Sequence, residues 1–273
     1  MTRVRRLSHR LGWSCVLLAL WTTSAHAQAP TPPARPPLVT DRPDFTESSD
    51  VIPRRWLQFE SGVTVEWDGS DVFRTRSVSA PAALFRLGLG FRTELRIGAE
   101  GYVIERRETE RTAGYSDVEL GAKVQLLQQG PNAFDLSLIP IVSLPAGDAG
   151  LSSDGVDPTL KVTWARGLPA GFSLAGNVNF SWITEGGSHF GQQALSLSVN
   201  RDIGRGWSGY LEVYGFSKVT RTEGAGIIVN GGVGRQFAGR VQIDLEAGHG
   251  LTDEAPDWFV GAGFALLLPS WKQ

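Results

Sequence analysis

Strict alternation of apolar and polar residues runs through long stretches of the chain after residue 55 and restricts the folds open to it. In residues 56–67, WLQFESGVTVEW, one face carries Leu57, Phe59, Val63, Val65 and Trp67, and the other carries Gln58, Glu60, Thr64 and Glu66. Residues 93–105, 116–127 and 240–248 alternate in the same way. Successive side chains of a β-strand point to opposite faces, so each stretch predicts a strand with one apolar and one polar face.

About twelve such strands are expected, and each is long enough for a tilted membrane crossing of about 9–11 residues. Strands of soluble proteins average about 5–6 residues, which disfavours an ordinary sandwich. After residue 27, no apolar run reaches the roughly 20 residues that a spanning helix needs. We therefore predict an all-β fold, a single antiparallel transmembrane β-barrel over residues 56–273. The expected strands are 56–67, 77–90, 93–106, 115–128, 132–144, 156–166, 171–184, 190–203, 206–220, 225–237, 240–251 and 257–268.

The connections between these strands alternate between short and long. Short turns are expected at 91–92, 128–131, 167–170, 204–205 and 238–239. Longer, more polar loops are expected at 67–76, 106–114, 146–157, 184–190, 220–224 and 252–257. Outer-membrane barrels have short periplasmic turns and longer external loops, so both barrel ends would lie on the periplasmic side.

The N-terminus has the pattern of a secretory signal peptide. Arg3, Arg5, Arg6 and Arg10 precede an apolar run over 11–21, and Ala25-His26-Ala27 matches a small-x-small cleavage site. We predict that residues 1–27 are removed, and with them Cys15, the only cysteine. The balance then changes from 26 basic and 28 acidic residues to 22 and 28, a net charge of −6. This charge argues against a nucleic-acid partner. The signal peptide and the barrel strands together predict export to the bacterial outer membrane.

Two segments without strand periodicity precede the first strand. Residues 28–39 are rich in proline and alanine and predict a flexible or polyproline-like lead. Residues 40–55, TDRPDFTESSDVIPRR, are densely charged. We hypothesise that they fold into the lumen as a plug, with Asp41, Arg42, Asp44 and Glu47 pairing with wall charges such as Arg86, Arg96 and Glu94. The alternative is a disordered periplasmic lead.

The polar strand faces would line the lumen of the barrel. The candidate lumen and plug residues are Asp41, Arg42, Asp44, Glu47, Glu60, Arg86, Glu94, Arg96, Glu100, Asp117, Glu119, Lys123, Asp244 and Glu246. Two interpretations remain open, an acidic pore that favours cations and a structural ion-pair network that fills the lumen.

Several motifs resemble those of the outer-membrane transporter family labelled "MetA-pathway of phenol degradation". They are TDRPD at 40–44, TES at 46–48, QFESG at 58–62, LFRLGL at 84–89, ELR at 94–96, SDVELGAK at 116–123, SLPAG at 143–147, Asp244, GHGL at 248–251 and APDWFVGAG at 255–263. The resemblance covers nearly all of the chain after the predicted signal peptide. It implies one outer-membrane barrel of about twelve strands that transports small solutes, aromatic or hydrophobic ones among them. The C-terminus departs from the aromatic last residue that the barrel-assembly machinery reads, because two polar residues follow Trp271.

Catalysis is not expected. After residue 27 the only histidines are His189 and His249, and no serine is marked as a nucleophile beside either. We expect no cofactor and no metal site. The expected partners are outer-membrane lipid, the assembly machinery and an unidentified small solute, with the barrel itself a monomer. A structural or loop-mediated interaction barrel is the alternative to transport, and a barrel-embedded hydrolase is a third.

Overall fold

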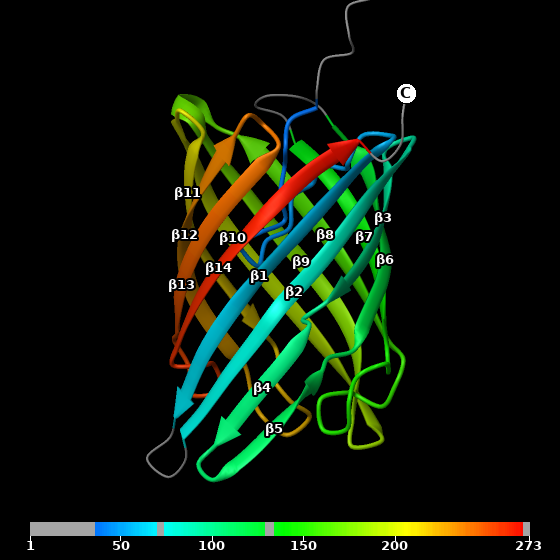
Figure 1. The fold of residues 1–273 in the computed structure, drawn as a ribbon, viewed down its shortest axis with the longest axis vertical. Helices are drawn as coiled ribbons and strands as arrows, with labels where there is room; N and C mark the ends of the chain where they lie inside the picture. The colour runs from blue at the N-terminus through cyan, green and yellow to red at the C-terminus, as the bar shows by residue number, and fades with distance from the viewer. Residues whose placement is uncertain (1–35, 70–73, 129–133, 270–273) are drawn as a thin grey trace, which may run out of the picture. The chain divides into compact units, whose positions relative to one another are not determined.

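The computed structural model describes residues 36–69, 74–128 and 134–269, and its strands form one antiparallel sheet closed into a barrel (Figure 1). Closure comes from β1, which pairs with both β14 and β2. The strands are β1 (Trp56–Gly69), β2 (Arg74–Gly90), β3 (Thr93–Ala99), β4 (Tyr102–Arg107), β5 (Glu110–Tyr115), β6 (Val118–Leu127), β7 (Phe134–Leu144), β8 (Asp157–Gly167), β9 (Phe172–Glu185), β10 (Ser188–Gly204), β11 (Trp207–Phe216), β12 (Gly226–Phe237), β13 (Val241–Gly250) and β14 (Trp258–Pro269).

These fourteen strands make twelve crossings of the barrel wall. Strands β3 and β4 both pair with β2, and together they form one crossing that is interrupted at 100–101. Strands β5 and β6 form the next crossing, interrupted at 116–117. At the first interruption Gly101 has φ +84°, and a Cβ there would overlap the Pro81 carbonyl oxygen of β2. The break therefore requires glycine at this position.

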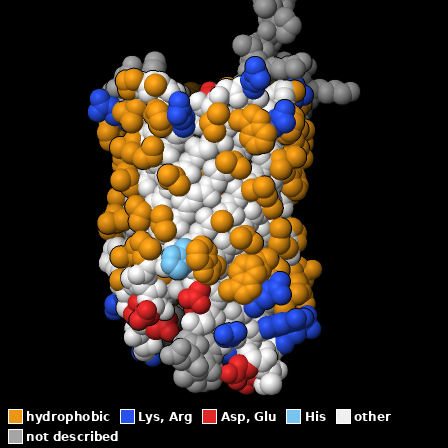
Figure 2. All heavy atoms as spheres, turned by 90° about the vertical axis from the view of Figure 1, so that its left-hand side faces the viewer, with side chains coloured by type: hydrophobic (Ala, Val, Ile, Leu, Met, Phe, Trp, Pro, Cys, Tyr) orange, Lys and Arg blue, Asp and Glu red, His pale blue; other side chains and the backbone are white. Residues whose placement is uncertain are grey.

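Burial in this barrel is inverted relative to a soluble protein. Polar side chains such as Arg86, Ser198 and Asp244 are at most 1% exposed, whereas Leu211 on the outer face is 71% exposed. Figure 2 shows hydrophobic side chains covering the outer wall between two ends that carry charges. Apolar residues on the outside and polar residues on the inside are what a membrane-spanning barrel requires. The predicted fold class is confirmed.

The connections agree in part with the prediction. The turns at 91–92, 205–206 and 238–240 are short, and the 168–171 turn contains a 3-10 helix, η1 (Pro169–Gly171). The loops at 145–156, 217–225 and 251–257 are longer and lie at the opposite end of the barrel. The turn predicted at 128–131 and the tip of the predicted 67–76 loop fall largely outside the described residues. The barrel begins at Trp56 and ends at Pro269, which pair at the short-turn end.

Two predicted loops are wrong. Residues 106–114 form most of the β4–β5 hairpin, with only 108–109 between the strands. Their charges hid the strands, because this hairpin extends to the long-loop end of the barrel, where an outer face need not be apolar. The predicted 184–190 loop is a two-residue turn in which Gly186 and Gly187 have φ +56° and +74°. Positive φ at both central residues is the requirement of a tight hairpin turn.

Among the described residues, no helix is long and apolar enough to cross a membrane. The predicted signal peptide, residues 1–27, lies outside the described residues.

Candidate functional site: a segment inside the lumen

Residues 36–55, called here the lumen segment, pass through the barrel interior and bond to its wall on many sides. Its backbone and side chains meet polar groups of most strands, including Gln58 of β1 and Gln242 of β13. Figure 1 shows this part of the chain within the barrel. The wall residues that it hydrogen bonds are Gln58, Glu60, Arg86, Glu94, Arg96, Lys123, Gln125, Ser137, Lys161, Thr163, Asn177, Ser196, Ser198, Glu212, Gln236, Gln242 and Asp244.

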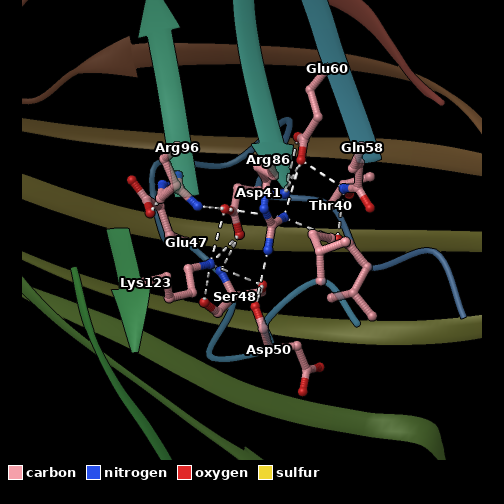
Figure 3. Close-up of polar contacts among 12 residues, drawn as sticks. Thr40, Asp41, Glu47, Ser48, Asp50, Gln58, Glu60, Arg86, Arg96 and Lys123 are labelled. Atoms are coloured by element: carbon pink, nitrogen blue, oxygen red, sulfur yellow. Dashed lines mark hydrogen bonds and ion pairs between the residues drawn. The ribbon is translucent and has the colours of Figure 1, made fainter. Parts of the chain in front are cut away.

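Asp41 lies at the centre of a buried group of charges (Figure 3). Its carboxylate is 2.6 Å from Nη1 of Arg96, 3.0 Å from Nζ of Lys123 and 3.2 Å from Nη1 of Arg86. None of these side chains is more than 5% exposed. The three cations come from β3, β6 and β2, so one carboxylate of the segment connects three strands.

Glu47 gives the segment a second charged contact with the same side of the wall. Its two carboxylate oxygens lie 2.9 Å from Arg96 and 2.6 Å from Nζ of Lys161 on β8. Two wall carboxylates complete the set, Glu60 at 3.2 Å and Glu94 at 2.8 Å from Arg86. We call these eight side chains the charge cluster: Asp41, Glu47, Glu60, Glu94, Arg86, Arg96, Lys123 and Lys161.

The charge cluster is balanced only while the lumen segment is docked. The wall contributes four cations and two carboxylates to it, and Asp41 and Glu47 supply the two missing negative charges. A buried charge that loses its partner is destabilising by about 3–5 kcal/mol. The wall therefore holds the segment by charge complementarity as well as by shape.

Arg42 makes the opposite contact across the lumen. Its Nη2 lies 3.4 Å from Asp244 and 4.0 Å from Glu246, both on β13. A Cβ at Gly62 or Gly263 would meet its guanidinium group within about 2.7 Å, so two wall glycines leave room for this side chain. The segment thus presents carboxylates to the cationic side of the wall and a cation to the acidic side.

The backbone of the segment is bound by wall side chains as well. Glu212 of β11 accepts hydrogen bonds from the Phe45 and Thr46 amides at 2.8 and 2.7 Å. Ser137 and Gln125 donate to the Ser49 carbonyl at 2.6 and 3.1 Å. A segment without regular secondary structure needs such partners, because buried backbone groups without hydrogen bonds are costly.

The short-turn end of the segment is held by apolar packing. Leu38 is 3% exposed and packs with Ile52, Ala265, Leu267 and Trp56. The last residues of the lead predicted over 28–39, from residue 36 onward, are docked against the wall. An apolar residue in a proline-rich run carries no periodicity that would have indicated burial. Residues 28–35 lie outside the described part of the chain.

An aromatic group lies on the β11 side of the segment. The Phe45 ring stacks on Tyr214, with centroids 4.4 Å apart and planes within 4° of parallel. The Phe216 ring meets Phe45 edge-on at 5.5 Å. Ile228 and Phe259 extend this group along the wall. Aromatic pairs in stacked or edge-on contact stabilise a structure by about 0.5–1.5 kcal/mol beyond the area they bury, so this group helps to hold the segment against the wall.

Burial and neighbouring charge shift the acid groups of the segment in opposite directions. Burial would raise the pKa of Asp41, but Arg86, Lys123 and Arg96 outweigh burial and lower that pKa well below its usual range. Burial would likewise raise the pKa of Glu47, but Arg96 and Lys161 outweigh burial and lower that pKa to about 2. Burial and the negative charge of Glu212 raise the pKa of Asp44 well above its usual value. Of these three acids, Asp41 and Glu47 favour the charged form and Asp44 favours a proton.

Two cavities border the lumen segment, one toward each end of the barrel. A cavity of about 450 Å³ is lined by Arg42 and Glu47 together with Leu151 and Ser153 of the 145–156 loop. A second cavity of about 390 Å³ is lined by the segment and by short-turn-end residues, Gly167 and Ser208 among them. The segment therefore lies between an outer and an inner chamber.

The structure brings most predicted site residues together. The predicted partners Arg86 and Arg96 pair with the segment, whereas Arg42 pairs with Asp244 and Glu246 instead of Glu94. Glu100, Asp117 and Glu119 form none of the ion pairs of the charge cluster, and they line the outer cavity beside its members Glu47 and Arg96.

The neutral residues that bind the segment were not among the predicted site residues; they include Ser137, Thr163 and Asn177. Glu212, which binds the backbone of the segment, is likewise absent from the candidate residues given above. Nothing in the sequence distinguishes these from other polar wall residues.

The family follows from the sequence match. Residues 40–268 match the family model described as "Putative MetA-pathway of phenol degradation", so the chain belongs to this family. The match begins in the lumen segment and ends in β14. No curated protein matches the chain.

Solved structures with the same fold are outer-membrane barrels. An outer membrane channel from Pseudomonas putida F1 is similar with a TM-score of 0.62 at 12% identity, over 81% of this chain and 98% of that one. The β domain of the Bordetella autotransporter BrkA is similar with a TM-score of 0.52 at 12% identity, over 80% of this chain and 100% of that one. The NanC porin is similar with a TM-score of 0.50 at 8% identity, over 77% of this chain and 98% of that one. At these identities the likeness establishes the fold alone, a β-barrel like those of outer-membrane proteins.

Proposed function

We propose that this protein is a gated outer-membrane channel for small solutes and that passage requires the lumen segment to move. One observation carries the proposal, namely the position of residues 36–55 between two cavities, bonded to strands around the barrel. In the docked state this segment separates the outer chamber from the inner one. A channel of this design conducts only as often as the segment leaves its site.

The bonds that hold the segment suit a gate more than a permanent filler. Arg42, Asp41 and Glu47 pair with the wall by charge, and Phe45 and Leu38 pack against it. None of the segment's residues, 36–55, belongs to a strand, because the first strand of the barrel begins at Trp56. Displacement would therefore leave the twelve-crossing wall intact.

The solute class that we propose is small aromatic or hydrophobic molecules. The family description names phenol degradation, and the P. putida structure is of an outer membrane channel. The Phe45–Tyr214–Phe216 group supports the same class, because a planar solute would find stacking partners where the segment meets the wall. The expectation that the chain is not an enzyme stays a prediction.

Liposome swelling with the purified protein tests the channel. The solutes are a small aromatic alcohol and a sugar alcohol of similar mass, with the wild-type protein and a variant lacking residues 40–50. We expect slow entry of both solutes with the wild type, the aromatic one faster, and rapid entry of both after the deletion.

Heat-modifiable gel migration shows that each variant contains an assembled barrel. If neither assembled protein passes any solute, the barrel is a structural or loop-mediated interaction protein. Equal rates for wild type and deletion would exclude the lumen segment as a gate and leave the channel itself standing.

A further inference from the structure

A row of three arginines faces outward at the long-loop end of the barrel, across three adjacent strands. Arg76 of β2 is directly opposite Arg106 of β4, and Arg106 is directly opposite Arg111 of β5. All three side chains are exposed. Their outward direction follows from alternation with Val103, which is 9% exposed, and from Arg76 lying over the outward Trp67 ring at 5.7 Å.

Like charges in this arrangement repel each other. Directly opposed residues of antiparallel strands have Cβ atoms about 4.5–5.5 Å apart, and like charges there destabilise the pair. Within the described ranges, none of the three arginines makes an ion pair with a carboxylate. The hairpin acids Glu105 and Glu110 alternate with the arginines and so lie on the inner face. An external anion would relieve this repulsion.

The row continues into an aromatic series on the neighbouring strands. Trp67 is opposite Arg76, Trp258 is opposite Trp67, and His249 is opposite Trp258. Tryptophans on the outer face of a barrel mark the level where lipid meets water. The arginine row therefore lies beside the interfacial aromatic girdle and continues it onto the neighbouring strands.

The residues one step toward the membrane on the same strands are apolar. Val78, Ile104 and Ala113 form the adjacent outward row, two residues or about 7 Å along each strand. Figure 2 shows Lys and Arg side chains gathered beyond the lower edge of the hydrophobic belt, at the long-loop end. A ligand bound here would place negative charge on the arginines and hydrocarbon on the row beneath them.

We propose that Arg76, Arg106 and Arg111 bind the phosphates of an anionic glycolipid of the outer leaflet, with its acyl chains on the Val78–Ile104–Ala113 row. The long-loop end faces outward in barrels of this kind, where the outer leaflet is built from phosphorylated lipid A. Guanidinium groups match phosphate oxygens with two parallel hydrogen bonds, which makes arginine the suitable residue. The site is separate from the lumen and does not depend on the channel proposal.

Binding of purified lipid A to the detergent-solubilised barrel tests the proposal, measured by native mass spectrometry. The test variant is Arg76→Gln/Arg106→Gln/Arg111→Gln. The matched control is Arg166→Gln/Arg201→Gln/Arg235→Gln, which removes the same charge from outward positions of β8, β10 and β12 near the short turns. The ligands are bisphosphorylated lipid A, its enzymatically dephosphorylated form and inorganic phosphate.

We expect the test variant to bind bisphosphorylated lipid A about tenfold or more weaker than the wild type, and the control variant to bind it equally well. The dephosphorylated lipid should bind the wild type as weakly as the phosphorylated lipid binds the test variant. Equal binding by test variant and wild type, or by the two lipid forms, would overturn the proposal. Inorganic phosphate that binds as tightly as the lipid would show a simple anion site and would overturn the lipid assignment.

Discussion

Nζ of Lys123 lies 3.0 Å from both carboxylate oxygens of Asp41, across 82 residues of sequence and with neither side chain more than 3% exposed. The contact joins the lumen segment to β6 in the barrel wall. Because both groups are buried, their interaction is weakly screened and depends on the segment staying docked.

Removal of either partner should release the segment. Lys123→Met leaves Asp41 with fewer counter-charges, and Asp41→Asn leaves the wall cations in excess, each at a cost of about 3–5 kcal/mol to docking. We expect both variants to raise the fraction of time that single channels in planar bilayers are open. The loss of docking free energy in the double variant should be smaller than the sum of the losses in the two single variants by about 1–3 kcal/mol. An additive result would show that the two side chains do not interact.

A methyl group at Gly88 should exclude the segment by shape alone. A Cβ at this β2 position would overlap the backbone carbonyl oxygens of Ile52 and Pro53, which cannot move without the segment. Gly88→Ala should therefore increase the swelling rate of liposomes toward that of the 40–50 deletion. The matched control is Gly98→Ala on β3, where the nearest atom to a Cβ is 3.6 Å away. Similar rates for the two variants would contradict the contact.

Truncation of Leu38 should loosen the apolar end of the segment. Leu38→Ala removes a side chain that is 3% exposed, at a cost of about 2–5 kcal/mol to docking. Glu47 is 8% exposed inside the barrel, so a protease that cuts after glutamate reaches this bond only when the segment leaves. We expect cleavage after Glu47 to be at least about tenfold faster in Leu38→Ala than in the wild type. Leu211→Ala, on the lipid face and 71% exposed, is the control and should leave the rate unchanged.

Rising pH should weaken docking through Asp44. Burial and Glu212 raise the pKa of Asp44 in the docked state, so its contribution is complete below the unshifted value of about 4 and is lost as pH rises through the raised one. Asp41 and Glu47 have lowered pKa values, so their contribution is lost only as pH falls, for Glu47 toward about 2.

The open fraction of single channels should accordingly increase as pH rises above the unshifted Asp value of about 4 and through the raised pKa of Asp44. Asp44→Asn keeps a hydrogen-bond acceptor for Ser198 and removes the titration, so its profile should be flatter. A variant with the slope of the wild type would assign the pH dependence to another group.

The barrel was predictable from the sequence because its wall repeats one signal in every crossing. Apolar and polar faces alternate from Leu57 onward, and the burial of Gln58 and Glu60 confirms which face is inside. The β4–β5 hairpin was not predictable in this way. At the long-loop end its outer face carries Arg106 and Arg111, so the apolar half of the pattern disappears while strand pairing continues.

The site was predictable only where charge was involved. Arg86 and Arg96 on a buried face need carboxylates, and the nearby sequence that supplies them is the segment with Asp41 and Glu47. Ser137 and Asn177 bind backbone groups of the segment, and their position around the lumen depends on strand tilt and register. The alternation of apolar and polar residues predicts which face of the wall a residue lies on. It does not predict the position of that residue along the barrel axis or its neighbours across the lumen.

A reversible disulfide between the segment and the wall tests the gate most directly. The hydroxyl oxygens of Thr46 and Ser196 of β10 are 2.6 Å apart, and the only native cysteine, Cys15, lies in the predicted signal peptide. Thr46→Cys/Ser196→Cys would fix the segment when oxidised. Thr159→Cys/Ser181→Cys is the matched control, because those hydroxyl oxygens, 2.9 Å apart, join β8 to β9 within the wall.

We expect oxidation to abolish entry of the aromatic solute into liposomes containing Thr46→Cys/Ser196→Cys, and reduction to restore it, while the control passes solute in both states. Undiminished entry through the oxidised segment-to-wall variant, with the disulfide confirmed by mass spectrometry, would contradict a channel gated by residues 36–55.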